Sequence, residues 1–565
     1  MKKRLFVLSI AILLFSCTFE KKQNPENRTV VAEKDSVIIP KKQAPFYWES
    51  ANVYFLLTDR FNNGKPENDI NFKRTDTTGV LRGFMGGDIA GITHKIEQGY
   101  FSNLGINAIW FTPVVEQIHG GTDEGEGKTY GYHGYWTKDW TSLDPNFGTR
   151  KELERLVKTA HENGIRILLD VVLNHTGPVT ELDPIWPEQW VRNGPTCEFN
   201  NYENTVRCNL VENLPDILTE NDTNVELPDA LLAKWKEEGR LSNELDELQL
   251  FFDRTGYPRA PRYYIIKWLT DYINDLGIDG FRVDTVKHVD EHVWSDLQKE
   301  ASYAFETWKK KHPQEVLDDT PFFMVGEVYG YGISGLRNFD FGDKKVDYFS
   351  HGFHSLINFE LKNDALNDYE TIFKKYSTIL HNQLSGKSVL NYLTSHDDQA
   401  PFDKERQKSR YAANVLLLTP GVAQVYYGDE TDRKLVIDGA EGDATLRSFM
   451  NWEDLDTVPS VQQTLKHWQK LGKFRRDHPA IGAGIHSKLA SKPYVFSRSF
   501  TDGDYKDKVV VGLNLPKGKK YLWVKGFFGD GTKLYDTYSD TEVEVANGQV
   551  ILENDFDIAL LEVAQ

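Results

Sequence analysis

Long hydrophobic runs are missing from this 565-residue chain after its first fifteen positions, so no later segment is apolar enough to cross a membrane. Basic runs are missing too, because nothing like Lys2-Lys3-Arg4 recurs and the formal net charge is -18. An acidic surface repels phosphate backbones, which excludes nucleic acid as an expected partner. Internal repeats and low-complexity tracts are also absent, and an apolar content of 40% excludes a disordered chain.

Cysteine is equally scarce, and the two that lie beyond the N-terminal segment are Cys197 and Cys208. Nothing around them indicates metal binding or catalysis. Because they lie close together in a polar stretch, we expect a disulfide in an oxidising compartment; the alternative is a pair of unlinked thiols. Aromatic residues are plentiful at 13%, and their positions must decide between core packing and stacking on a ligand.

The first residues have the features of an export signal. The apolar run 5–15 is shorter than the ~20 residues of a membrane span and suits the core of a signal peptide. It ends at Leu14-Phe15-Ser16-Cys17, which resembles the lipobox of bacterial lipoproteins, where the cysteine is acylated and becomes the first mature residue. We therefore expect a signal peptide at 1–16, lipidation of Cys17 and a flexible linker over 17–45. The predicted location is the outer membrane, facing the periplasm or the outside, with simple secretion as the alternative.

From about residue 50 to 430, short apolar strands alternate with amphipathic helices, which is the pattern of a parallel β/α fold. Eight such strands favour a (β/α)8 barrel, also called a TIM barrel. The sixth strand has the weakest pattern. The predicted strands are 53–57, 108–111, 165–173, 280–283, 322–325, 346–349, 389–393 and 422–427.

The helices between the strands carry clear end signals. Residues 149–152 read Thr-Arg-Lys-Glu, a capping box in which Thr and Glu side chains satisfy free backbone N–H groups. An apolar stripe follows over 153–160, and Gly164 supplies a left-handed stop. A second helix is predicted over 263–276 and ends at Gly277.

The order of predicted strands and helices divides the chain into three folded parts. The barrel domain is predicted over 46–480, and the long connection after its third strand is interpreted as an inserted subdomain at about 176–260, because a structureless loop of that length is rare. After residue 480, alternating strands with turn signals indicate a C-terminal antiparallel β-sandwich over 481–565.

Three of the predicted strands end in a carboxylate, at Asp284, Glu327 and Asp397. The C-terminal strand ends of such a barrel meet at the face where chemistry takes place. One acidic residue there has an ordinary explanation, since loops are polar, but three together point to a shared task. Glycoside hydrolysis needs such a set, because one carboxylate attacks the anomeric carbon and another protonates the leaving oxygen.

The neighbours of these carboxylates suit that division of roles. Arg282 lies two residues before Asp284 on the same face of its strand, where a guanidinium favours an ionised attacking group. The negative charges of Asp284 and Asp397 would raise the pKa of Glu327 and keep it protonated near neutral pH.

The motifs around these residues resemble those of the α-amylase family, glycoside hydrolase family thirteen, over about residues 50–565. They stand in the family's order and at plausible separations. The motifs are Gly105–Pro113, Tyr132–Trp136, Asp170–His175, Gly280–His288, Val325–Glu327, Thr394–Asp398 and Gly421–Glu430.

By matching position, the resemblance implies that Asp284 is the nucleophile and Glu327 the general acid/base, with Asp397 stabilising the oxocarbenium-like transition state. It also implies a set of substrate-binding side chains around the cleaved bond. These are Tyr135 as a stacking platform beside His133, Arg282 orienting the nucleophile, Lys287 beyond the cleavage point, and His175, His288 and His396. We expect Trp136 to pack in the barrel instead.

Two calcium sites are implied by the same resemblance, since hard oxygen ligands are what this ion prefers. The ligands of the first would be the Asn174 and Asp216 side chains and the His288 carbonyl, pinning the insertion over the cleft. The ligands of the second would be Asn63, Asn68, Asp69, the Gly86 carbonyl and Asp88. Lys65 departs from the usual Asn of that loop, and an ordinary Asn/Gly turn is the alternative. No organic cofactor is expected.

The reaction is narrowed by finer similarities. Lys287-His288 after the nucleophile is similar to α-amylases and related endo-acting enzymes, and the run Glu116–Gly121 is similar to periplasmic α-amylases that release maltooligosaccharides. Ser395 stands where chloride-dependent amylases have Asn, so no chloride requirement is expected. About 85 residues follow the barrel, whereas cyclodextrin-forming relatives usually carry further C-terminal domains.

The sequence therefore predicts a monomeric, retaining, endo-acting glycoside hydrolase that cleaves internal α-1,4 links of starch, glycogen or maltooligosaccharides by double displacement. Two alternatives stay open. One is a neopullulanase-like or transglycosylating enzyme on the same active site. The other is a glucan-binding lipoprotein without catalysis, against which the presence of all three carboxylates argues.

Overall fold

The structure is a computed structural model that describes residues 44–123 and 125–564. The predicted signal peptide, the lipidation site Cys17 and nearly all of the predicted linker lie outside the described residues. Among the residues that are described, no helix combines the length and apolarity that a membrane span requires.

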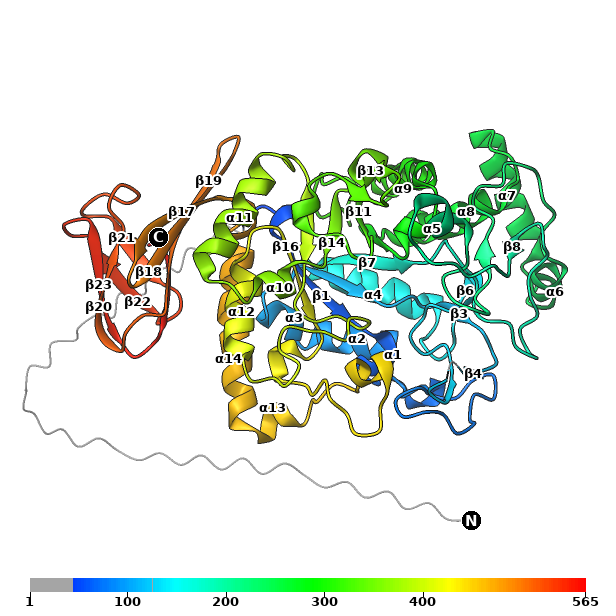
Figure 1. Cartoon of the computed structure of the whole chain (residues 1–565), viewed down its shortest axis with the longest axis horizontal. Helices are drawn as coiled ribbons and strands as arrows, with labels where there is room; N and C mark the ends of the chain where they lie inside the picture. Colours follow the sequence, from blue (N-terminus) through cyan, green and yellow to red (C-terminus); the bar gives the residue numbers. More distant parts are fainter. Residues whose placement is uncertain (1–43, 124, 565) are drawn as a thin grey trace, which may run out of the picture. The chain divides into compact units, whose positions relative to one another are not determined.

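Eight parallel strands close into a barrel, with the order β1-β16-β15-β14-β11-β10-β7-β2 and β2 pairing back to β1. Figure 1 shows these strands at the centre of the barrel with helices around them. This confirms the predicted (β/α)8 barrel. The strands are β1 (Asn52–Leu56), β2 (Ala108–Phe111), β7 (Arg166–Val171), β10 (Gly280–Val283), β11 (Phe323–Gly326), β14 (Ser355–Asn358), β15 (Ser388–Asn391) and β16 (Val422–Tyr426).

The sixth barrel strand is not where the sequence pattern placed it. Residues 346–349 do not enter the barrel, because Lys345–Val346 forms β13, which pairs with β12 (Phe339–Asp340), and Tyr348–His351 forms a 3-10 turn. The barrel strand is β14, whose end residues Ser355 and Asn358 are polar yet fully buried. The Asn358 amide donates to the Asn391 side chain at 2.8 Å, so a polar contact inside the barrel replaces the expected apolar side chains.

The main helices cover the barrel from outside. Thr149 and Glu152 form the predicted capping box at the start of α4, and Gly277 ends α8 with a positive φ of 76°, so both predicted helix ends are confirmed. The long helices are α2 (Ile89–Glu97), α4 (Arg150–Glu162), α8 (Pro261–Leu276), α9 (Glu291–Lys311), α11 (Tyr369–His381), α12 (Ser409–Leu418) and α14 (Pro459–Asp477). Single-turn helices are α1 (Thr58–Phe61), α3 (Tyr100–Asn103), α10 (Leu361–Asp364), α13 (Asp454–Thr457) and α15 (Ala480–Ala483).

Two connections at the C-terminal side of the barrel are folded. The first, between β2 and β7, contains β3 (Val115–Gln117) paired with β6 (Thr137–Leu143), and β4 (Thr122–Asp123) paired with β5 (Lys128–Thr129). The second, between β7 and α8, is called the insertion below. Its elements are β8 (Val191–Arg192), α5 (Tyr202–Arg207), β9 (Asp216–Ile217), α6 (Asp229–Glu237) and α7 (Leu241–Thr255). Within it, Cys197 and Cys208 form a disulfide.

The C-terminal part forms antiparallel sheets with a hydrophobic cluster of their own. One sheet has the order β17-β18-β19-β24-β21-β22 and the other pairs β20 with β23. The strands are β17 (Ile485–Ser491), β18 (Tyr494–Asp502), β19 (Tyr505–Leu513), β20 (Gly518–Trp523), β21 (Lys533–Asp536), β22 (Thr541–Glu544), β23 (Gln549–Asn554) and β24 (Ile558–Val563).

Two buried arginines lie near the junction of these sheets with the barrel, and Arg498 of β18 joins the two parts. The Arg498 guanidinium donates to the carbonyls of Ile481 and Leu418, at 2.6 and 3.2 Å. Arg475 of α14 donates to the carbonyls of Leu417 and Thr419, both at 3.0 Å, in the turn that leads into β16. Neither arginine is exposed, so these carbonyls depend on the two guanidiniums for their hydrogen bonds.

Candidate active site

Arg282 organises the carboxylates at the C-terminal end of the barrel. Its strand β10 lies between β7 and β11, so its guanidinium reaches acidic side chains from both neighbours. Nη1 lies 2.7 Å from Asp284 Oδ1 and 3.0 Å from Asp170 Oδ1, and Nη2 lies 3.0 Å from Glu327 Oε2. One cation therefore fixes the relative positions of the two residues predicted as nucleophile and acid.

Asp170 was missed as a site residue, although it opens one of the sequence motifs. Its Oδ2 accepts hydrogen bonds from Trp110 Nε1 at 2.8 Å and from the Tyr135 hydroxyl at 2.9 Å. Asp170 therefore links Arg282 to the ring predicted as the sugar platform. Asp170 lies inside β7 and three residues before the end of the predicted strand 165–173, so a search of the predicted strand ends passes over it.

The protonation of the two central carboxylates follows from burial and charge. Burial raises the pKa of Glu327 to about 8, and the charges of Asp284 and Asp397 add to this rise against the opposing effect of Arg282. Burial also raises the pKa of Asp284, while the Arg282 guanidinium opposes that rise. Of the pair, Glu327 is the group that carries the proton at neutral pH.

Asp397 stays ionised, and its side chain is half-buried in the cavity wall. Burial disfavours its charged form, but the neighbouring His396, the Arg282 and Arg447 guanidiniums and the Ser395 hydroxyl hold the pKa of Asp397 below its usual range. The Ser395 hydroxyl donates to Asp397 Oδ1 at 3.1 Å. The site thus combines one protonated and one firmly charged carboxyl group.

The histidines of the site are neutral and have defined partners. Burial lowers the pKa of both His175 and His396 to about 4. His175 Nε2 lies 3.1 Å from the Tyr135 carbonyl oxygen, which only accepts, so this nitrogen carries the ring proton. The Tyr135 ring stacks on His396, with centroids 5.3 Å apart, and the Tyr135 N–H donates to His133 Nδ1 at 3.1 Å.

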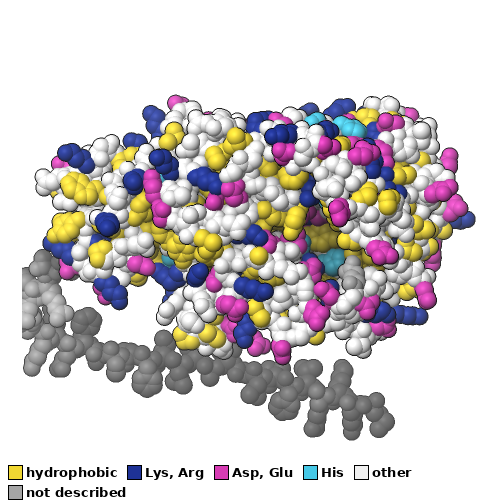
Figure 2. Space-filling view, viewed as in Figure 1, with side chains coloured by type: hydrophobic (Ala, Val, Ile, Leu, Met, Phe, Trp, Pro, Cys, Tyr) yellow, Lys and Arg dark blue, Asp and Glu magenta, His cyan; other side chains and the backbone are white. Residues whose placement is uncertain are grey.

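These side chains line one cavity of about 520 Å³. On the face shown in Figure 2, a hollow exposes histidine and hydrophobic side chains, and acidic and basic side chains are interspersed around it. The predicted residues in the cavity lining are His133, Tyr135, His175, Asp284, Lys287, His288, Glu327, His396 and Asp397, while Arg282 lies beneath them. The lining also contains residues that we did not predict, among them Arg82, Phe199, Tyr329, Asp443 and Arg447. These come from loops with no motif of their own, so the sequence carried no local signal for them.

Comparison with known proteins identifies this arrangement. The family model described as "Alpha amylase, catalytic domain" matches residues 55–479. The chain belongs to the alpha-amylase family. The periplasmic alpha-amylase of Escherichia coli is 37% identical over 525 residues, covering 83% of this chain and 72% of that protein. A cyclomaltodextrin glucanotransferase from Bacillus licheniformis is 27% identical, covering 95% of this chain and 68% of its own length.

Solved structures agree on the fold. An Anoxybacillus alpha-amylase aligns with a TM-score of 0.64 at 23% identity, covering 92% of this chain and all of that one. A structure described as the first cyclomaltodextrin glucanotransferase with a three-domain ABC distribution aligns with a TM-score of 0.62 at 21% identity. Its alignment covers 91% of this chain and 99% of that one.

Lys287 and His288 join the alpha-amylase barrel to its surroundings. Lys287 Nζ donates to the Tyr329 carbonyl at 3.2 Å, at the wall of the cavity. His288 Nδ1 lies 3.0 Å from the Thr205 carbonyl oxygen, in helix α5 of the insertion. Burial lowers the pKa of His288 to about 3, so this link involves a neutral ring that donates to the carbonyl.

The residues predicted for the first calcium site are only partly brought together. Asn174 Nδ2 donates to Asp216 Oδ1 at 3.3 Å, and the Asn174 carbonyl accepts from the Ile217 N–H at 2.8 Å. Asp216 is 1% exposed, and Arg192 Nε lies 3.9 Å from its Oδ2. A buried carboxylate with so distant a cation fits a site for a positive ion.

The residues predicted for the second calcium site converge around Gly86. A Cβ on Gly86 would lie 2.5 Å from Asn63 Nδ2 and 2.7 Å from Asp69 Oδ1, so the loop closes tightly on this glycine. The side-chain oxygen of Asn68 and Oδ2 of Asp88 are buried without hydrogen-bond partners. Unsatisfied buried oxygens fit a hard cation, although no cluster of three His, Cys, Asp or Glu side chains is arranged for a metal within the described part of the chain.

Proposed function

We propose that this glycoside hydrolase of the alpha-amylase family cleaves internal α-1,4-glucosidic bonds of starch, glycogen and maltooligosaccharides with retention of configuration. The observation that carries the proposal is the shared hold of Arg282 on Asp284 and Glu327, two carboxyl groups at the C-terminal end of the barrel. Retaining glycosidases need such a pair, one ionised to attack and one protonated to assist departure.

In the proposed reaction, Asp284 attacks the anomeric carbon and forms a covalent glycosyl ester while the glycosidic C–O bond breaks. Glu327 gives its proton to the departing oxygen. It then takes a proton from water, whose oxygen displaces Asp284, and this step restores both side chains. Asp397 lies across the cavity as a fixed negative charge that stabilises the positive character of the transition state.

The remaining predicted residues have binding roles in this proposal. A sugar ring presents C–H groups that suit the face of Tyr135, whose hydroxyl is held by Asp170. His133, His175 and His396 are uncharged, so they exchange hydrogen bonds with sugar hydroxyls without adding a charge to the site. Lys287 supplies a donor beyond the cleavage point, and the ring of His288 lies beside it in the lining.

The proposal includes calcium, a lipid anchor and a domain division. One calcium ion would be held between barrel and insertion by Asn174, Asp216 and the His288 carbonyl. A second would be held in the loop after β1 by Asn63, Asn68, Asp69, Gly86 and Asp88. At both sites the ion would supply positive charge to buried oxygens. Acylation of Cys17 would hold an otherwise monomeric enzyme at the outer membrane. The barrel would span 46–480, the inserted subdomain about 176–260 and the C-terminal domain 481–565.

Transglycosylation is the second candidate, because several relatives are cyclomaltodextrin glucanotransferases. The length of the chain does not argue against it. One such enzyme is described as having a three-domain ABC distribution, and the alignment covers 99% of it. A chain without further C-terminal domains is therefore compatible with transglycosylation. Only the reaction products distinguish hydrolysis from transglycosylation.

The test uses the soluble chain from about Lys21 onward, amylose and the variant Asp284→Asn. We expect a spread of α-anomeric maltooligosaccharides, and a loss of about 10³-fold or more in the variant. Cyclic products, or short donors that grow into longer chains, would move the assignment to transglycosylation. Binding of amylose without cleavage by the unaltered chain would overturn the enzymatic proposal.

A further inference from the structure

A second cavity, of about 680 Å³, lies outside the active site and exceeds it in volume. Its walls come from three segments. These are the hairpin that contains β3 and β6, the residues that follow β7 from Thr176 to Gln189, and the insertion from Asn224 to Lys234. None of the three predicted catalytic carboxylates lines it.

The two cavities are separated by one layer of backbone. Trp136 lines the active site and its neighbour Thr137 lines the second cavity; His175 and Thr176 divide in the same way. The Gly177 N–H donates to the Thr137 carbonyl at 2.8 Å, which ties the two segments of the wall together. A ligand in the second cavity would thus lie immediately behind the residues that contact substrate.

Trp186 offers the second cavity a fixed aromatic surface. Its ring makes T-shaped contacts with the buried rings of Trp140 and Trp190, at centroid distances of 5.6 and 5.2 Å. Two tryptophans therefore set the plane of Trp186, which is itself only half-buried. Beside it the exposed Ile185 and the prolines at 184 and 187 extend the apolar part of the lining.

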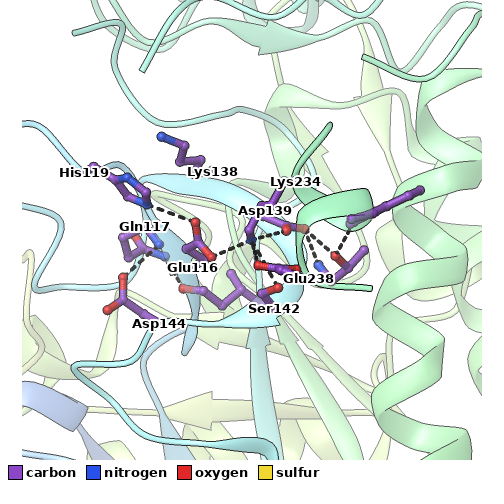
Figure 3. Close-up of polar contacts among 12 residues, drawn as sticks. Glu116, Gln117, His119, Lys138, Asp139, Ser142, Asp144, Lys234 and Glu238 are labelled. Carbon is purple, nitrogen blue, oxygen red and sulfur yellow. Dashed lines mark hydrogen bonds and ion pairs between the residues drawn. The ribbon is translucent and has the colours of Figure 1, made fainter. Parts of the chain in front are cut away.

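The lining contains two lysines and four carboxylates, and both lysines are held in ion pairs. Lys138 Nζ lies 2.6 Å from Asp183 Oδ1. Lys234 of α6 lies between two carboxylates, 2.6 Å from Glu116 Oε2 and 2.5 Å from Asp139 Oδ2, as Figure 3 shows. Carboxylates outnumber lysines along this wall and only accept hydrogen bonds, so the wall suits an uncharged ligand with many hydroxyls better than an anion.

We propose that the second cavity binds a segment of an α-glucan chain, with a glucose ring stacked on Trp186 and hydroxyls on the paired carboxylates and lysines. The inference rests on the proposed function, which makes α-glucan the polymer that this protein meets. A sugar presents an apolar C–H face and a polar edge, and the cavity offers both kinds of surface. A chain held there would keep the polymer beside the active site between cleavage events.

Titration calorimetry with maltoheptaose tests the inference on the whole chain carrying Asp284→Asn, which binds without cleaving. We expect two binding events. Adding Trp186→Ala should weaken one of them about tenfold, whereas Trp186→Phe, which keeps a stacking ring, should largely preserve it. Equal melting temperatures of the two variants would show that the loss is not caused by unfolding.

A matched control removes an exposed indole elsewhere. Trp523 on β20 is 47% exposed, and Trp523→Ala should leave both binding events in place. In the active enzyme, Trp186→Ala should lower kcat/KM on soluble starch several-fold more than on a short maltoside. A single binding event in every variant, an equal effect of Trp523→Ala, or equal losses on both substrates would overturn the inference.

The failure of the proposed function has a different signature. If the unaltered chain does not cleave amylose, the enzymatic proposal fails whatever the titration gives. If it cleaves amylose and Trp186→Ala changes neither binding nor the starch-to-maltoside ratio, only the second cavity loses its assignment.

Discussion

At the scale of single residues, Arg282 is the side chain on which most of the active site depends. It is 1% exposed and contacts Asp170, Asp284 and Glu327 through two terminal nitrogens. A planar guanidinium can serve carboxylates on different strands at once, whereas a lysine presents one point charge. The geometry of nucleophile and acid is thus set by a residue that does not line the cavity.

Replacing this arginine tests that dependence. We expect Arg282→Lys to lower kcat by about 10²-fold or more, because one ammonium cannot hold Asp284 and Glu327 together. Arg150→Lys is the matched control, since Arg150 forms an exposed ion pair with Asp275 and should change activity less than about twofold. Steady-state kinetics on a maltooligosaccharide would measure both, and similar activities for the two variants would contradict the assigned role.

The pH dependence of the reaction belongs to Glu327. Its protonated form is the proposed acid, and burial raises its pKa to about 8, so kcat/KM should fall as pH rises through about 8. The charge of Asp397 contributes to that rise, so Asp397→Asn should move the alkaline limb to lower pH in its residual activity. A limb that stays in place or moves upward would contradict this reading of the site.

At the scale of elements, the insertion is held to the barrel by a cluster of charges. Lys234 of α6 bridges Glu116 of β3 and Asp139 of β6, and both carboxylates are more than nine-tenths buried. Arg240 adds a further contact to Asp139 at 3.2 Å, and His119 one to Glu116 at 3.0 Å. The helix that walls the second cavity is therefore attached by buried ion pairs, shown in Figure 3.

Replacing Lys234 tests how much this attachment contributes to the stability of the fold. Lys234→Met leaves two buried carboxylates short of a cation, and we expect a loss of about 3 kcal/mol in the free energy of unfolding at pH 8. The carboxylates of the folded variant would bind protons more tightly than those of the unfolded chain, so the loss should shrink towards pH 5. Urea denaturation measures this, with the exposed Lys236→Met on the same helix as control; equal effects of both variants would contradict the argument.

Sequence patterns predicted elements well where local chemistry decides them. The capping box at Thr149 and the stop at Gly277 are short-range signals, and the helices end where these residues place them. Strand β14 escaped prediction because its end residues, Ser355 and Asn358, are polar, and Asn358 finds its partner Asn391 only when the neighbouring strand packs beside it. Arg447 lay outside the predicted site for a related reason, since its contact with the His396 carbonyl is long-range and has no local sequence pattern.

At the scale of the whole molecule, the first proposed calcium site lies where distant segments meet, and the second closes one long loop after β1. A cation that binds only the folded state stabilises it by mass action. We expect a chelator to lower the melting temperature by about 3–5 °C, and calcium, but not magnesium, to restore it. Asn68→Ala should reduce this response, and a melting temperature that does not change with chelator would remove calcium from the proposal.

Arg498, which joins the C-terminal sheets to the barrel, restricts how this chain can be divided. Arg498 donates to carbonyls before and after helix α14, at Leu418 and Ile481, so the barrel's last turn draws its donors from a strand of the next part. A chain cut near residue 480 would remove Arg498 and leave the Leu418 carbonyl without this donor. The barrel therefore depends on the C-terminal sheets for part of its hydrogen bonding. A shortened or fused form of this protein has to retain these sheets together with the barrel.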